Sequence, residues 1–293
     1  MVTDSINKIS INGSDDNIGD SMTSSLNQTP TQGLWRKGVL VQIQGGVWSM
    51  ETKLTADDLN LISGEVPEFA TLGKKKLLDS KHKNDFLSVI GKARSGAERF
   101  GFPFVLTGSY FVPFGNFDRL KKVVEEQQIV FSRKVDSFIN RYSEYRAEYL
   151  ERFSQYREKL ETYYPEPEYV RSKFTMNAIY YVASMSGVLS NTGSSDDMYL
   201  EWAVNSMNGL RSEARDVADV IRKANSGGNL DGRTMRRVQT LIDRLQNMDM
   251  LEDSSLRNAA LNLAADATMG NADALEAAAK DVPVSSVRSL LLD

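Results

Sequence analysis

The residue types that carry out most enzymatic and metal chemistry are scarce in this chain of 293 residues. It has no cysteine and a single histidine, His82, so we exclude thiol catalysis, disulfides, zinc fingers, iron–sulfur clusters and histidine-based triads. A metal site would have to use carboxylates, and the Asn- and Asp-containing run at residues 225–231 lacks the ligand spacing and the bidentate Glu of a calcium loop. We therefore expect no catalytic residue, no metal and no cofactor.

Glycines in the aromatic-rich residues 100–114 raise the question of a phosphate-binding loop. Their spacing matches neither of the two glycine patterns that cradle nucleotide phosphates. The same residues instead predict a hairpin whose two extended pieces meet at Thr107, Gly108 and Ser109. We expect this hairpin to pair with a strand at residues 38–44, which has residues 48–53 as a second candidate for pairing.

Two basic groups are candidates for contact with nucleic acid. The first lies in residues 71–99, which hold eight Lys or Arg against three acids, and the second lies on a helix predicted at residues 231–247. The candidate residues are Lys74, Lys75, Lys76, Lys81, Arg236 and Arg237. The alternative is that these side chains form the solvated faces of helices, with His82 at the surface. We prefer it, because the chain has a net charge of −4 and a pI near 5.3.

One long pattern of apolar residues dominates the middle of the chain. From residue 116 to residue 164, without Gly or Pro, these residues return every third or fourth position, as they do along the seam of paired helices. An unbroken helix over this range would be roughly 70 Å long. Asn116 is its predicted N-cap, and Pro165 and Pro167 end it.

The seam of this predicted helix is rich in aromatic side chains. We interpret them as packing residues rather than a ladder for stacking bases, because the charges between them are balanced in sign. The candidates for packing against a partner are Phe131, Phe138, Tyr142, Tyr145, Tyr149, Phe153 and Tyr156.

Composition divides the remainder of the chain into three parts. Residues 1–33 are polar and predict a flexible arm, residues 34–189 a small β element with the long helix, and residues 190–293 a C-terminal helical domain. In the last part we expect helices from residue 195 to the glycines at 227–228, then at residues 231–247, 255–269 and 272–280. Residues 170–189 are compatible with either a strand or a helix. The fold class is mainly α with a small β element, comprising a long coiled-coil-like helix and a C-terminal helical bundle.

A series of short motifs in a fixed order resembles the bacterial and phage domain-of-unknown-function family 3150, over residues 33–185. The motifs are Gly38-Val39-Leu40-Val41 with Trp48, Lys53-Leu54-Thr55 with Asp58-Leu59, Gly101-Phe102-Pro103-Phe104, Tyr110 to Pro113, and Arg171-Ser172-Lys173-Phe174. The resemblance implies an accessory part in an assembly, because members are often encoded near a MoxR-type AAA ATPase and a von Willebrand factor A-type protein. It implies no catalytic residues.

Two function classes remain from the sequence. The first is a non-enzymatic adaptor or self-assembling subunit, an oligomer working with an AAA ATPase in the cytoplasm of a bacterium or of a phage-infected cell. The second is a nucleic-acid-associated accessory protein. No run of eighteen apolar residues and no signal peptide occurs, so we do not expect a membrane protein.

Overall fold

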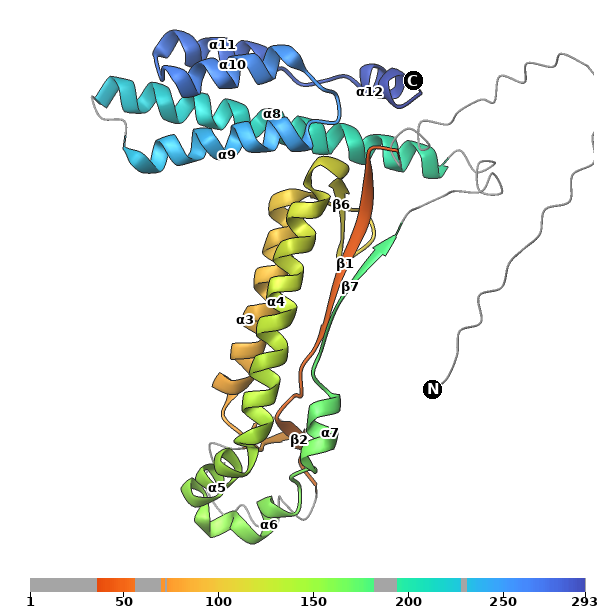
Figure 1. The fold of residues 1–293 in the computed structure, drawn as a ribbon, viewed down its shortest axis with the longest axis vertical. Helices are drawn as coiled ribbons and strands as arrows, with labels where there is room; N and C mark the ends of the chain where they lie inside the picture. The colour runs from red at the N-terminus through yellow and green to blue at the C-terminus, as the bar shows by residue number, and fades with distance from the viewer. Residues whose placement is uncertain (1–35, 56–69, 72, 182–193, 228–230, 293) are drawn as a thin grey trace, which may run out of the picture.

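The computed structural model of the chain is mainly helical with small antiparallel sheets. It describes residues 36–55, 70–71, 73–181, 194–227 and 231–292. These residues form a long stem with a helical crossbar at one end and a set of short elements, the tip, at the other (Figure 1). The predicted flexible arm and the predicted boundary at residues 189–190 fall outside the described residues.

The stem consists of one sheet and two long helices. Its strands are β1 (Gly38–Gly46), β5 (Phe102–Pro103), β6 (Ser109–Pro113) and β7 (Thr175–Tyr181), and its helices are α3 (Ser80–Phe100) and α4 (Phe114–Asn140). The sheet order is β5-β6-β1-β7, and every pairing is antiparallel. The predicted hairpin and its pairing with the first strand are therefore confirmed. Gly108, with φ of 76°, supplies the left-handed conformation in its turn.

The tip surrounds the far end of α3 and α4. It contains β2 (Glu51–Lys53), β3 (Ala70–Thr71), β4 (Lys74–Lys76), α5 (Tyr142–Arg152), η1 (Ser154–Tyr156), α6 (Arg157–Glu161) and α7 (Pro167–Ser172). A second sheet has the order β2-β4-β3. Residues 51–53 thus pair with β4 and not with β1, so the prediction that residues 48–53 pair with the first strand was wrong.

The crossbar contains the C-terminal helices. They are α8 (Ser194–Gly227), α9 (Gly232–Met248), α10 (Ser254–Ala265), α11 (Met269–Ala278) and α12 (Val284–Leu292). Helices α8 to α11 share one buried apolar cluster, and α9 contacts α3, α4 and β6 of the stem. Helices were predicted in each of these regions except that of α12.

The prediction of one unbroken helix over residues 116–164 was wrong. Helix α4 ends at Asn140, and backbone angles outside the helical region at Arg141, Phe153 and Tyr156 divide the remainder into α5, η1 and α6. The breaks turn the seam around the end of the stem, where the Tyr142 hydroxyl donates to the Pro165 carbonyl and the Tyr164 hydroxyl to the Leu77 carbonyl. The spacing of apolar residues by three and four positions continues across these breaks, so the spacing alone does not predict where the helix ends.

Two further expectations about helix starts and strands need correction. Helix α4 begins at Phe114, and Asn116 is not its N-cap but a buried residue whose side-chain amide donates to the Phe100 carbonyl. The lysines at residues 74–76 lie on a strand rather than a helix, because α3 begins only at Ser80. Residues 175–181, compatible with strand or helix by sequence, form β7.

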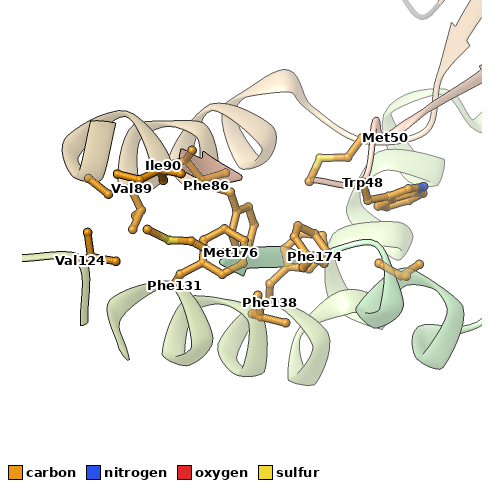
Figure 2. Packing of buried hydrophobic residues seen from close by; sticks show 14 of the residues in the cluster. Trp48, Met50, Phe86, Val89, Ile90, Val124, Phe131, Phe138, Phe174 and Met176 are labelled. Carbon is orange, nitrogen blue, oxygen red and sulfur yellow. The ribbon is translucent and has the colours of Figure 1, made fainter. Parts of the chain in front are cut away.

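Aromatic side chains of α3 and α4 pack together with Phe174 in the core of the stem. The Phe86 ring lies 5.6 Å from both Phe131 and Phe138 and 4.5 Å from Phe174, between centroids (Figure 2). On β1, Gly45 lets α3 approach closely, since an added Cβ would lie 2.4 Å from the Ile90 Cδ1 atom. Burial of these rings stabilises the stem through both apolar area and ring–ring contact.

We predict that Phe86→Ala lowers the free energy of unfolding by about 3–5 kcal/mol, because it leaves a cavity between α3 and α4. The matched control is Leu87→Ala, which removes the neighbouring side chain, 44% exposed, and should change stability by at most about 0.5 kcal/mol. Denaturant unfolding followed by circular dichroism measures both variants. Equal losses would contradict the packing described.

Candidate interaction surface

The aromatic seam lies largely inside the chain's own core. Of the seven residues predicted to pack against a partner, Phe131, Phe138, Tyr142 and Tyr149 are buried, while Tyr145, Phe153 and Tyr156 are partly buried. Their neighbours are residues of the same chain, such as Trp48, whose ring centroid lies 5.8 Å from that of Tyr142. The four buried residues are therefore unavailable to a partner, because a single chain already covers them.

The lysines of the tip do not form one basic surface. Lys75 is fully buried, with its Nζ 3.0 Å from the centroid of the Tyr163 ring, a cation–π geometry. Lys74 pairs with Glu51 at 3.4 Å and Lys81 with Asp79 at 3.7 Å. Lys76 is half-buried. The solvated-face interpretation was thus wrong for Lys75, and two of the other three lysines are neutralised locally.

The second basic group lies on α9. Arg236 and Arg237, with Arg233, line a cleft of about 300 Å³ whose other wall includes Glu213 and Asp216 of α8. This cleft belongs to the crossbar, whereas the tip lysines lie at the opposite end of the stem, next to β2 (Figure 1). The structure therefore does not bring the two predicted nucleic-acid groups together.

His82 packs against aromatic rings at the start of α3. Its ring centroid lies 4.3 Å from that of Tyr145, and the side chain is partly buried. Desolvation lowers its pKa below the usual 6.5, Lys81 lowers it further, and Asp79 and Asp85 act in the opposite direction. No group of three or more His, Asp or Glu side chains within the described residues is arranged to hold a metal ion.

A groove at the junction of stem and crossbar was not predicted. This junction groove is a hollow of about 580 Å³ between the β5–β6 hairpin and the helices α8 and α9. Its lining consists of Phe102, Pro103, Val105, Met198, Glu201, Trp202, Asn205, Ser206, Gly209, Leu210, Glu213 and Arg244. Val105 and Met198 at its edge are 38% and 43% exposed, and Leu106 in the same turn is 55% exposed. Three apolar side chains at or beside the edge of the groove are thus open to solvent, whereas Phe102, Trp202 and Leu210 in its lining are buried.

Trp202 of α8 holds the crossbar against the hairpin. Its indole Nε1 donates to the Pro103 carbonyl at 2.7 Å, and its ring lies 4.9 Å from Phe104 and 5.3 Å from Phe111, between centroids. A buried tryptophan needs an acceptor for its N–H, and Pro103 supplies it.

Ion pairs complete the joint between stem and crossbar. Arg119 of α4 donates from both terminal nitrogens to Asp243 of α9, at 2.8 and 2.9 Å. Within the crossbar, the fully buried Arg211 pairs at 3.0 Å with Asp253, whose other carboxylate oxygen caps α10. Nearby, burial raises the pKa of Asp249, although its carboxylate accepts from backbone N–H groups. The joint is therefore fixed by directional bonds as well as by apolar packing.

The sequence held a weak signal for this groove. Met198 and Trp202 lie four residues apart, with the small Ser206 and Gly209 following on the same side of the helix. The opposite wall comes from a hairpin about a hundred residues earlier, which the spacing within α8 does not indicate.

We predict that the single histidine titrates below pH 6.5 in the folded protein. The unfolded chain binds this proton more readily than the folded chain does. Neutral His82 therefore contributes fully to the free energy of unfolding above pH 6.5, and this contribution is lost as the pH falls through the lowered pKa of the folded state. The imidazole resonance, which only His82 gives, measures this pKa by nuclear magnetic resonance. His82→Phe should remove this part of the pH dependence, and a pKa at or above 6.5 would contradict the burial described.

Comparisons with known proteins give one match. The family model described as protein of unknown function (DUF3150) matches residues 36–270, which extends beyond the expected limit at residue 185 to include α8, α9 and α10. Comparison with curated proteins and with solved structures found no match for the chain. Among the described helices, none has the length and apolar character needed to cross a membrane. With its β1 strand, hairpin, stem and most of the crossbar inside the matched range, the chain belongs to the domain-of-unknown-function family 3150.

Proposed function

We propose that this protein is a non-enzymatic interaction or assembly protein. The observation that carries the proposal is the junction groove, a hollow lined by apolar side chains of which Val105 and Met198 remain exposed. Apolar surface that is gathered in a concavity is typical of a site for a protein partner. The groove lies between secondary-structure elements held by Trp202 and by the Arg119–Asp243 pair, so its shape is preorganised.

The partner we propose is an AAA ATPase of the MoxR type, within a system that includes a von Willebrand factor A-type protein. This partner comes from what the family resemblance implies about neighbouring genes. The location we propose is the cytoplasm of a bacterium or of a phage-infected cell. Self-association into an oligomer is part of the same proposal. The elongated stem would separate contacts made at the crossbar from contacts made at the tip (Figure 1).

The finer description of the helices also belongs to this proposal. Packing of α3 along α4 supports the coiled-coil-like character predicted for the seam, within the chain rather than between chains. The apolar cluster shared by α8, α9, α10 and α11 supports the predicted C-terminal bundle. The α3–α4 pair and the C-terminal bundle would then form two rigid units, one on either side of the junction.

A nucleic-acid-associated role remains the second candidate, favoured by one observation. Arg233, Arg236 and Arg237 converge on the cleft beside α8. Arginines are the usual contacts to phosphate oxygens, but Glu213 and Asp216 on the facing wall oppose an anion there.

For the first candidate, we expect the purified chain to co-purify with a MoxR-type AAA ATPase when the two are co-expressed. Light scattering after size exclusion then gives the mass of the chain alone and of the complex. A chain that is monomeric at all concentrations and elutes separately from the ATPase would overturn the proposal. A co-expressed unrelated AAA ATPase is the control for non-specific association.

For the second candidate, the charge-reversed double variant Arg236→Glu with Arg237→Glu separates the two functions. If the arginine cleft binds nucleic acid, this variant should lose at least about tenfold in affinity for DNA at low salt, and the wild-type affinity should fall as salt rises. Fluorescence anisotropy with labelled single- and double-stranded DNA measures both. Absence of binding at low salt removes this candidate.

A further inference from the structure

We propose that the junction groove binds an amphipathic helix of a partner protein, with apolar side chains facing the groove and Lys or Arg beside them. The inference rests on the proposed function, because it describes the chemistry of the partner that an interaction protein would bind. The shape of the groove, the backbone groups at its edge and its charge each support it.

The length and depth of the groove fit a helix. Its lining residues on α8 run from Met198 to Glu213, about 22 Å along the helix axis and four turns long. Midway, Ser206 and Gly209 lower the surface of α8, and a Cβ added to Gly209 would meet no atom within 4 Å. A partner helix could therefore approach the α8 backbone here more closely than a larger residue would permit.

The strand edge beside the groove does not suit an added strand. Strand β5 comprises only Phe102 and Pro103, and Pro103 has no backbone N–H to offer. The Pro103 carbonyl already accepts the Trp202 indole N–H. Because strand addition requires a row of available backbone groups, the groove favours binding through side chains, as an amphipathic helix does.

The apolar lining defines which side chains the partner should supply. Phe102, Trp202 and Leu210 lie in the groove, and Val105 and Met198 lie at its edge. Apolar residues spaced at i, i+3 or i+4, and i+7 on a helix would align with such a surface. Met198 has a flexible, polarizable side chain that adapts to different apolar partners.

The charges along the groove favour a basic partner. Glu201 and Glu213 line it, and Arg244, which also lines it, pairs with Glu213. Glu201 is exposed and has no ion-pair partner in the part of the chain that the structure describes. The remaining net charge of the lining is therefore negative, and a Lys or Arg next to the apolar stripe of the partner would complement it.

A displayed library of helical peptides tests the proposal without knowledge of the natural partner. Each peptide has apolar residues at i, i+3, i+4 and i+7 and random residues beside them, and the full-length protein is the target of selection. We expect enriched peptides to carry Lys or Arg beside the apolar positions. Anisotropy with a labelled enriched peptide should show at least tenfold weaker binding to Gly209→Trp, whose side chain fills the groove.

Gly91→Trp is the matched control, since an added Cβ at this α3 glycine also meets no atom within 4 Å and lies outside the groove. It should bind the peptide as the wild type does. Glu201→Lys is an independent variant that keeps the groove open, and selection on it should enrich acidic residues at the same positions. Thermal unfolding of each variant establishes that it is folded.

Several outcomes would overturn the proposal. These are no enrichment over random peptides, no loss of affinity on Gly209→Trp, and an unchanged charge preference on Glu201→Lys. A concentration-dependent dimer that Gly209→Trp abolishes would assign the groove to a second copy of this chain instead. If Gly209→Trp still co-purifies with the ATPase while peptide binding is lost, the proposed function stands and the groove is not its contact with the ATPase.

Discussion

The attachment of Trp202 to the β5–β6 hairpin is the interaction on which the shape of this protein depends. An indole ring buried among Phe102, Phe104 and Phe111 gains apolar contact only if its N–H also finds an acceptor. The Pro103 carbonyl meets the second condition, since it accepts the indole N–H at 2.7 Å. This fixes α8 across the end of the sheet, and the crossbar follows from it.

The ion pairs at the joint orient the crossbar more than they stabilise it. Arg119 and Asp243 are both partly exposed, and exposed pairs contribute typically less than about 1 kcal/mol. Their two parallel hydrogen bonds nevertheless define the angle between α4 and α9, because a planar guanidinium binds a carboxylate in this manner in few geometries. Apolar burial at Trp202 thus stabilises the joint, whereas the directional bonds of Arg119 set the angle between its helices.

The sequence predicts the elements of this fold better than their connections. The local spacing of apolar residues, with Gly and Pro at the ends of elements, predicts the mainly helical class. It also predicts the hairpin at residues 100–114 and the helices of the crossbar. It does not predict the break at Arg141, because an apolar seam looks the same whether its residues pack within one helix pair or around a corner. Burial of Lys75 also escapes such reasoning, since the Tyr163 ring that covers its ammonium group lies far along the chain. The candidate groove was missed for the same reason, as its two walls meet only in the folded chain.

The same joint that fixes the crossbar also creates the groove. Packing of Trp202 under the hairpin brings the turn with Val105 alongside α8, and the small residues Ser206 and Gly209 then leave a space that no side chain of the lining fills. The Cβ of an alanine at position 209 would meet no atom within 4 Å, and alanine would favour the helix by about 1 kcal/mol relative to glycine. Glycine at this position therefore has a cost to the helical conformation of α8. A helix bound in the groove would offset it, since close approach of two backbones is what glycine permits.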